Sequence, residues 1–167
     1  VLTRQSALLD AIRTIANEGE PVYKADLSAG YATELPHLAQ LRQMAALLNM
    51  NAAVQARQGN TEEAINDYLA IMSLGETLLD EPILISQLVR ISMLGMAYEG
   101  IGTVLQPGKL SPEQARRIVR ETAGAYHREA YANALAGETA FGLDAIDDAA
   151  EDGDLPFAMG GMGGFDS

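Results

Sequence analysis

The sequence contains no cysteine and no tryptophan, and its only aromatic residues are six tyrosines and three phenylalanines. The absence of cysteine excludes disulfide bonds, zinc sites built on thiolates and catalysis by a cysteine nucleophile. Basic residues are also scarce, because 11 lysines and arginines stand against 23 acids and give a net charge of −12. Nucleic-acid binding is therefore not expected, since a phosphate backbone has to be met by clustered positive side chains.

Alanine, leucine, isoleucine and methionine dominate the 167 residues instead. This composition favours closely packed helices, and the length fits one domain with a core of its own. Apolar positions recur with the period of a helix, and no window alternates convincingly with the period of two that is typical of a strand. The sequence therefore predicts an all-α fold, a compact bundle of five or six helices without a sheet.

Helix-start and helix-stop residues divide the chain. Gly59 with Asn60 closes one helix, Ser111 with Pro112 opens another, and Gly137 is expected to break the chain between the last two. We expect helices over residues 2–17, 34–58, 61–79, 82–106, 112–136 and 138–151. The helix over 82–106 has no consistently polar face, so it should be the hub of the core. A membrane span is not favoured there, because Arg90 near its middle would be costly in lipid.

The stretch from Gly59 to Tyr68 resembles the second half of a tetratricopeptide repeat. That motif needs a turn glycine, a small residue where two helices cross and an aromatic residue four positions later. Gly59, Ala64 and Tyr68 fill those places, and Ala52 suits the small position on the preceding helix. Because a solenoid needs about three repeats, we expect one TPR-like antiparallel hairpin over residues 36–79 inside a compact bundle, not an extended superhelix.

Three further runs, over residues 38–42, 80–90 and 137–142, are similar to a broad group of uncharacterised bacterial proteins that are membrane-anchored or exported. The resemblance implies an extracytoplasmic place in the bacterial cell envelope or at the cell surface, and no activity. The sequence begins with Val1 rather than methionine. We therefore expect that a leader or an N-terminal anchor preceded it, and that this anchor is the chain's only link to a membrane.

The C-terminal quarter is chemically distinct from the rest. Residues 129–167 carry nine acids and no base. We divide the chain into a helical domain over 1–154 and a glycine-rich tail over 155–167. Ordering such a tail costs roughly 1–2 kcal/mol per residue, so we expect its large apolar residues to dock on a protein surface, either of the same molecule or of a neighbouring copy. These interface residues are Phe157, Met159, Met162 and Phe165.

Two polar features of the sequence are candidate sites. Arg90 lies in the most apolar run, so it should be buried and paired. Glu138, Glu121 and Glu99 are candidate partners, of which we single out Glu138 for a buried ion pair. The alternative is that Arg90 binds a ligand carboxylate or phosphate. The acids over 144–154 are interpreted as a solvated helix face or, alternatively, as a weak divalent-cation site, although they lack the spacing of a calcium loop.

No serine nucleophile, phosphate-binding loop or convincing histidine–carboxylate pair stands in the sequence. We therefore expect no enzyme, no cofactor and no metal centre. The predicted function is a non-enzymatic protein-interaction or assembly subunit of the bacterial envelope. It would associate with itself through the tail into an oligomer or filament, or bind another envelope protein. The alternative is an accessory domain that binds a small ligand or a divalent cation.

Overall fold

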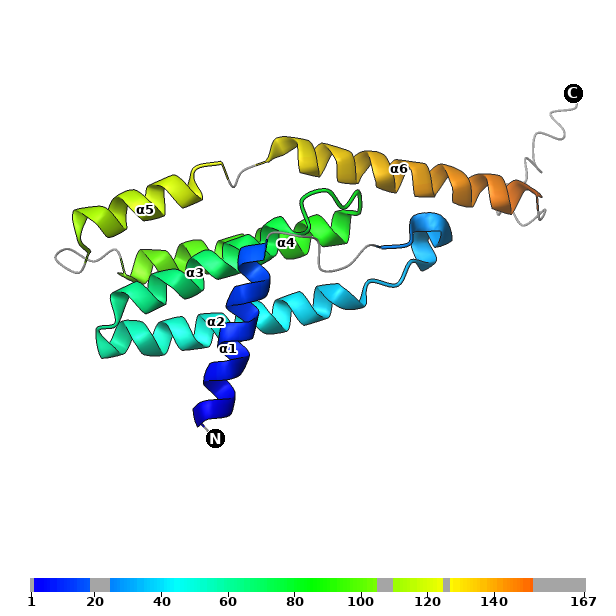
Figure 1. Ribbon diagram of the computed structural model, residues 1–167. Coiled ribbons are helices and arrows are strands. Elements are labelled where there is room, and N and C mark those ends of the chain that lie inside the picture. Colours follow the sequence, from blue (N-terminus) through cyan, green and yellow to red (C-terminus); the bar gives the residue numbers. More distant parts are fainter. Residues whose placement is uncertain (1, 19–24, 105–109, 125–126, 152–167) are drawn as a thin grey trace, which may run out of the picture.

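The computed structural model describes residues 2–18, 25–104, 110–124 and 127–151 (Figure 1). Within these ranges the chain forms helices and no strand, which confirms the predicted all-α bundle. None of the described helices is both long and apolar enough to cross a bilayer. The elements are α1 (Leu2–Glu18), the short 3-10 helix η1 (Leu27–Ala32), α2 (Pro36–Gln58), α3 (Thr61–Glu76), α4 (Leu84–Val104), α5 (Pro112–Thr122) and α6 (Arg128–Glu151).

Helix α3 lies at the centre of the bundle. It contacts α1, α2, α4 and α5, and Figure 1 shows α1 crossing α2 and α3 at a steep angle. Ten of the 16 residues of α3 are buried. The sequence placed the hub one helix later, over 82–106. The difference arises because α4, although more apolar than α3, keeps one face uncovered.

The helical hairpin of α2 and α3 turns at Gly59. This glycine adopts a left-handed backbone with φ of 84°, and its N–H donates to the carbonyl of Ala56 at 3.2 Å. A residue with a side chain would be strained in that conformation. Ala52 and Ala64, both fully buried, lie in the interface of the two helices. The turn therefore stands where the sequence predicted it.

The boundary between the last two helices, α5 and α6, differs from the predicted one. Helix α5 already ends at Thr122, Gly124 has a φ of 106°, and α6 continues without interruption through Gly137. A Cβ atom at position 137 would overlap the carbonyl oxygen of Pro82. Gly137 thus lets α6 approach the start of α4 closely, whereas α5 ends where Ala123 adopts an extended backbone, directly before Gly124 with its positive φ.

One buried ion pair fastens α1 to the hairpin. Asp67 of α3 has no exposed surface. Its carboxylate accepts from Arg13 Nε at 2.8 Å and from Asn51 Nδ2 at 2.7 Å, and Arg13 Nη2 lies 2.6 Å from Asp67 Oδ1. Burial raises the pKa of Asp67 above its ordinary value, although the hydrogen bonds from Asn51 and Arg13 act in the opposite direction.

The two glycines of α6 offer a matched test of the close contact with Pro82. Gly137→Ala should lower the free energy of unfolding by at least about 2 kcal/mol, because backbone must move to admit the methyl group. Gly142→Ala in the same helix should be neutral or stabilising by up to about 1 kcal/mol, since its Cβ would lie 3.5 Å from the Tyr31 hydroxyl, an ordinary contact. Urea unfolding measures both. Equal effects of the two substitutions would contradict the assigned role of Gly137.

The raised pKa of Asp67 gives a pH-dependent prediction. A folded-state pKa above the unfolded one means that the folded protein holds the proton more tightly. The stability from this group is therefore fully present below the unfolded pKa and is lost as the pH rises through the folded pKa. The difference in unfolding free energy between wild type and Asp67→Asn should thus decrease as the pH rises above 3.8, the ordinary value. Urea unfolding at a series of pH values measures it, and a difference that grows with pH would refute it.

Candidate functional site

Helix α4 leaves an apolar face uncovered. Ile85, Leu88, Ile91 and Tyr98 are between 45% and 50% exposed. These residues are three or seven positions apart in the sequence, which places them on one side of the helix. Helix α6 runs alongside but buries only two small residues, Ala130 and Ala134. Large side chains on a helix this apolar are normally covered, so the uncovered face points to a surface that meets something else.

A cavity of about 490 Å³ opens between α4 and the beginning of α6. We call it the α4–α6 cavity. Its size falls in the range of small-molecule sites. Its lining combines aliphatic and tyrosine side chains with three groups that are, or can become, positively charged. The lining residues are Gln87, Arg90, Ile91, Leu94, Gly95, Tyr98, His127, Arg128 and Tyr131.

Arg90 is buried, as predicted, with 3% of its surface exposed. Its partner differs from the predicted one: Arg90 Nη2 lies 2.8 Å from Oε1 of Glu76, the last residue of α3. The second oxygen of the same carboxylate, Oε2, is 3.3 Å from His127 Nε2. Glu76 therefore ties α3 to α4 and to the residue that precedes α6.

The predicted pair of Arg90 with Glu138 is corrected by the course of α6. Because α6 passes through Gly137, Glu138 stands beside the first turn of α4. There its Oε1 accepts from the backbone N–H of Leu84 at 3.1 Å. Leu84 precedes Arg90 by six residues, about 9 Å along a helix. Glu138 thus satisfies a free N–H group at the start of α4, and its backbone carbonyl accepts from the Tyr31 hydroxyl at 3.1 Å.

Gln87 brings a second buried polar group to the cavity. Only 1% of the residue is exposed. Its Nε2 donates to the carbonyl oxygens of Leu78 at 2.7 Å and Glu81 at 3.0 Å, which close the turn after α3. Its Oε1 has no hydrogen-bond partner among the described residues. A buried acceptor without a donor is costly, so this oxygen is a site where a donor is missing.

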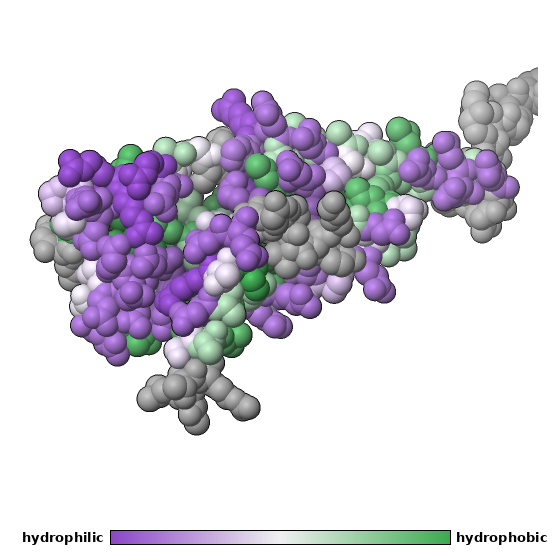
Figure 2. All heavy atoms as spheres, viewed as in Figure 1, coloured by the Kyte–Doolittle hydropathy of each residue, from purple (hydrophilic) through white to green (hydrophobic). Residues whose placement is uncertain are grey.

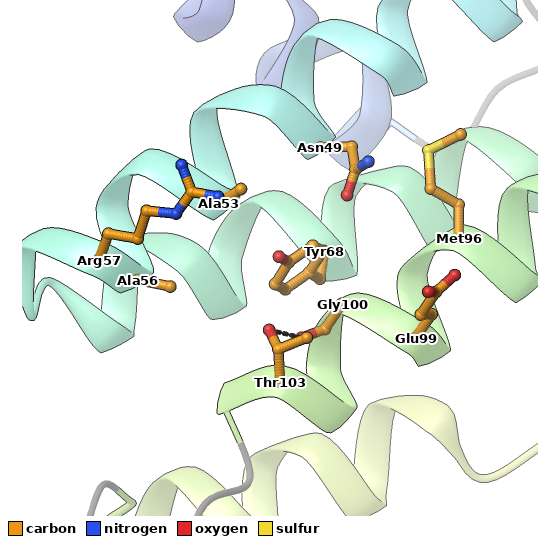
Figure 3. A pocket seen from close by; sticks show the side chains of 9 residues that line it. All are labelled: Asn49, Ala53, Ala56, Arg57, Tyr68, Met96, Glu99, Gly100 and Thr103. Atoms are coloured by element: carbon orange, nitrogen blue, oxygen red, sulfur yellow. Dashed lines mark hydrogen bonds between the residues drawn. The ribbon is translucent and has the colours of Figure 1, made fainter.

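A second hollow of about 420 Å³ lies between α2 and α4, above Tyr68 of α3 (Figure 3). The Tyr68 ring fits under α4 because Gly100 has no side chain, since a Cβ there would overlap the ring. The Thr103 hydroxyl donates to the Gly100 carbonyl at 2.7 Å. Arg57 and Glu99 lie on opposite sides of Tyr68 and do not converge on one point. This hollow is therefore the weaker candidate for a site.

The C-terminal half of α6 carries a second uncovered surface. Among the described elements α6 contacts only α4 and η1, and it runs on beyond the bundle (Figure 1). One contact with η1 is an edge-to-face packing of Phe141 on Tyr31, with ring centres 5.7 Å apart. Leu143 and Ile146 are 58% and 56% exposed.

Space-filling representation shows the same surface from one side (Figure 2). Hydrophobic residues appear along α6 where it leaves the main body, between polar ones. The polar residues near the end of α6 are acids without a nearby base, which the sequence interpreted as a solvated face or a weak cation site. They are exposed, at Asp144, Asp147, Asp148 and Glu151. In the described ranges no group of histidines and acids is arranged to hold a metal ion.

The tail residues Phe157, Met159, Met162 and Phe165 lie outside the described residues, so their docking stays a prediction. His37, an early residue of α2, is buried, and its Nε2 lies 2.8 Å from Glu81 Oε1.

Sequence reasoning missed Glu76 altogether. One signal could have revealed it, because an acid in the last turn of a helix opposes the helix dipole and calls for a positive partner. Asp67 was missed as well, although it stands among inward-facing apolar residues of α3. In both cases the partner is remote in the sequence, 14 residues away for Arg90 and 54 for Arg13.

No protein-family model, no curated protein and no solved structure matches this chain. The resemblances to a tetratricopeptide repeat and to exported bacterial proteins therefore stay predictions. The function has to be argued from the two uncovered surfaces and the cavity.

Substituting Arg90 tests the ion pair with Glu76. Arg90→Met should lower the free energy of unfolding by about 1–3 kcal/mol. Breaking a fully buried pair costs about 3–5 kcal/mol, but the Glu76 side chain is 33% exposed and regains water. Adding Glu76→Gln should recover part of the loss, because the unpaired charge disappears. Arg128→Met, at an exposed residue without an ion pair in the described ranges, is the control. Unfolding in urea that is unchanged by Arg90→Met would contradict the assignment.

Proposed function

We propose that this protein is a non-enzymatic assembly subunit of the bacterial envelope that associates head to tail with further copies of itself. The observation that carries the proposal is the end of α6, residues 142–151, which we call the arm. The arm projects from the bundle, and Leu143 and Ile146 on it are more than half exposed. An exposed helix with unpartnered apolar side chains is stable chiefly when another surface packs against it.

The charge of the arm indicates which surface that is. The arm carries four acids and no base, so a second arm would repel it and a basic surface would attract it. Helix α5 carries Arg116, Arg117 and Arg120 within 11 residues. Val119 among them is 67% exposed. Arg117 is held by Glu62 at 2.7 Å and Arg120 lies 3.5 Å from Glu121 of the same helix, whereas Arg116 makes no ion pair with any described residue. Helix α5 thus offers both the charge and the apolar contact that the arm lacks.

The two surfaces lie at opposite ends of the molecule (Figure 1). When the arm of one copy packs on α5 of the next, the pair still has one free arm at one end and one free α5 at the other. Such head-to-tail contacts repeat into an open filament, or into a ring if the rotation closes. The tail follows the arm in the sequence, and its interface residues Phe157, Met159, Met162 and Phe165 would extend the same contact. The envelope location rests on the resemblance to exported bacterial proteins alone.

Charge reversal of each surface tests the proposal. A head variant (Arg116→Glu with Arg120→Glu) and an arm variant (Asp144→Lys with Asp148→Lys) should each stay monomeric, because like charges would meet at every contact. An equimolar mixture should assemble again, since every contact between the two variants joins opposite charges. Light scattering coupled to size exclusion, at low salt and high protein concentration, measures the mass. Assembly of the wild type should weaken in 0.5 M salt, where the screening length falls to about 4 Å.

Arg42→Glu with Arg57→Glu on α2 is the matched control for the head variant, since it makes the same change in net charge outside both surfaces. This control should assemble like the wild type, and circular dichroism should show all variants equally helical. Deleting residues 156–167 measures the added contribution of the tail. A wild type that stays monomeric at every concentration, or variants that assemble unmixed, would refute the proposal.

A further inference from the structure

The α4–α6 cavity is chemically different from both assembly surfaces and lies between them. Ile91 and Leu94 supply an apolar wall, and the rings of Tyr98 and Tyr131 stand beside it. Leu94 is 7% exposed, whereas Ile91 and both tyrosines are about half exposed. The cavity therefore has a closed apolar part and an open side through which a small molecule can enter.

The charge of the lining is unusual for this protein. Arg90, His127 and Arg128 face the cavity in a chain with a net charge of −12. Glu76 neutralises part of this charge through its contacts with Arg90 and His127. Arg128 is exposed and forms no ion pair with any residue in the described ranges. A ligand with a carboxylate would meet a guanidinium that is not yet engaged, and such charge-assisted hydrogen bonds are the strong ones.

The buried oxygen of Gln87 is the second, independent sign of a ligand. Gln87 Oε1 lacks a donor among the described residues although the residue borders the cavity. Its amide nitrogen is already used by the turn after α3, so the side chain cannot turn over without losing those bonds. A water that accompanies a bound polar head group, or a hydroxyl on the ligand itself, would supply the missing hydrogen bond.

We infer that the α4–α6 cavity binds a small anionic amphiphile, a single straight chain that ends in a carboxylate. The chain would lie against Ile91 and Leu94, and the carboxylate would pair with Arg128. A volume of about 490 Å³ suits one chain of moderate length and not a two-chain lipid. The inference is independent of assembly, because none of these residues belongs to α5 or to the arm.

Decanoate is the probe, with decanol and decyltrimethylammonium as uncharged and cationic chains of equal length. Calorimetry on the full chain, below the micelle concentration, should give a dissociation constant for decanoate about tenfold lower than for decanol, and no binding of the cation. Arg128→Gln should bring decanoate to the affinity of decanol and leave decanol unchanged. Arg116→Gln, which removes an equal charge on α5, should change neither.

A filled cavity separates specific from surface binding. Gly95 borders the cavity, and a Cβ there meets no heavy atom within 4 Å, so Gly95→Leu can place a side chain at the cavity wall without moving the backbone. It should abolish binding of decanoate and decanol while the protein stays folded with an unchanged or higher melting temperature. Gly102→Leu is the control in the same helix, since Gly102 is equally open but does not line the cavity.

Four results would overturn the inference. They are equal binding of all three chains, undiminished binding to Gly95→Leu, binding of decanoate only after residues 156–167 are deleted, and binding to phosphatidylglycerol vesicles without binding of free decanoate. The third would assign the cavity to the chain's own tail, and the fourth would assign the positive side chains to a membrane surface. Tight, Arg128-dependent binding of decanoate that Gly95→Leu abolishes and Gly102→Leu preserves would establish it.

Discussion

The contact between Gly137 and the carbonyl of Pro82 fixes the position of α6, and the features discussed above follow from that position. With the backbones this close, Ala130 and Ala134 reach α4, and the Glu138 carboxylate meets the N–H of Leu84. Toward the start of α6 the same small residues leave a cavity. Toward its end the helix runs past the bundle and becomes the arm. The single glycine at position 137 thus determines where the cavity and the arm lie.

Buried charge complements this packing by linking helices that share little apolar surface. Asp67 joins α1 to the hairpin through Arg13 and Asn51, and Glu76 joins α3 to α4 and to His127. Neither pair is evidence of high stability, because desolvation offsets much of the attraction between buried ions. Their effect is to favour one arrangement of the helices, since an unpaired charge in any other arrangement would be costly.

Much of the fold could be predicted from local signals. Gly59 ends α2, Pro112 follows the N-cap Ser111, and the burial of Arg90 follows from its apolar neighbours. The partner of Arg90 could not be predicted, because Glu76 reaches it from another helix. Gly137 was misread because a glycine can mark either a helix end or a close approach. Only the position of Pro82 decides between them, and Pro82 is 55 residues earlier in the sequence.

The uncovered face of α4 also explains why α3, and not the predicted helix over 82–106, is the hub of the core. Hydrophobicity alone indicates that Ile85, Leu88 and Ile91 should be buried, but burial needs a neighbour with side chains large enough to cover them. Helix α6 meets α4 with alanine and glycine, which allow close backbones but cover little beyond the contact itself. A helix held by such small residues leaves large side chains exposed on both sides of the contact. The apolar face of α4 and the projecting arm are therefore two consequences of one alanine-rich helix.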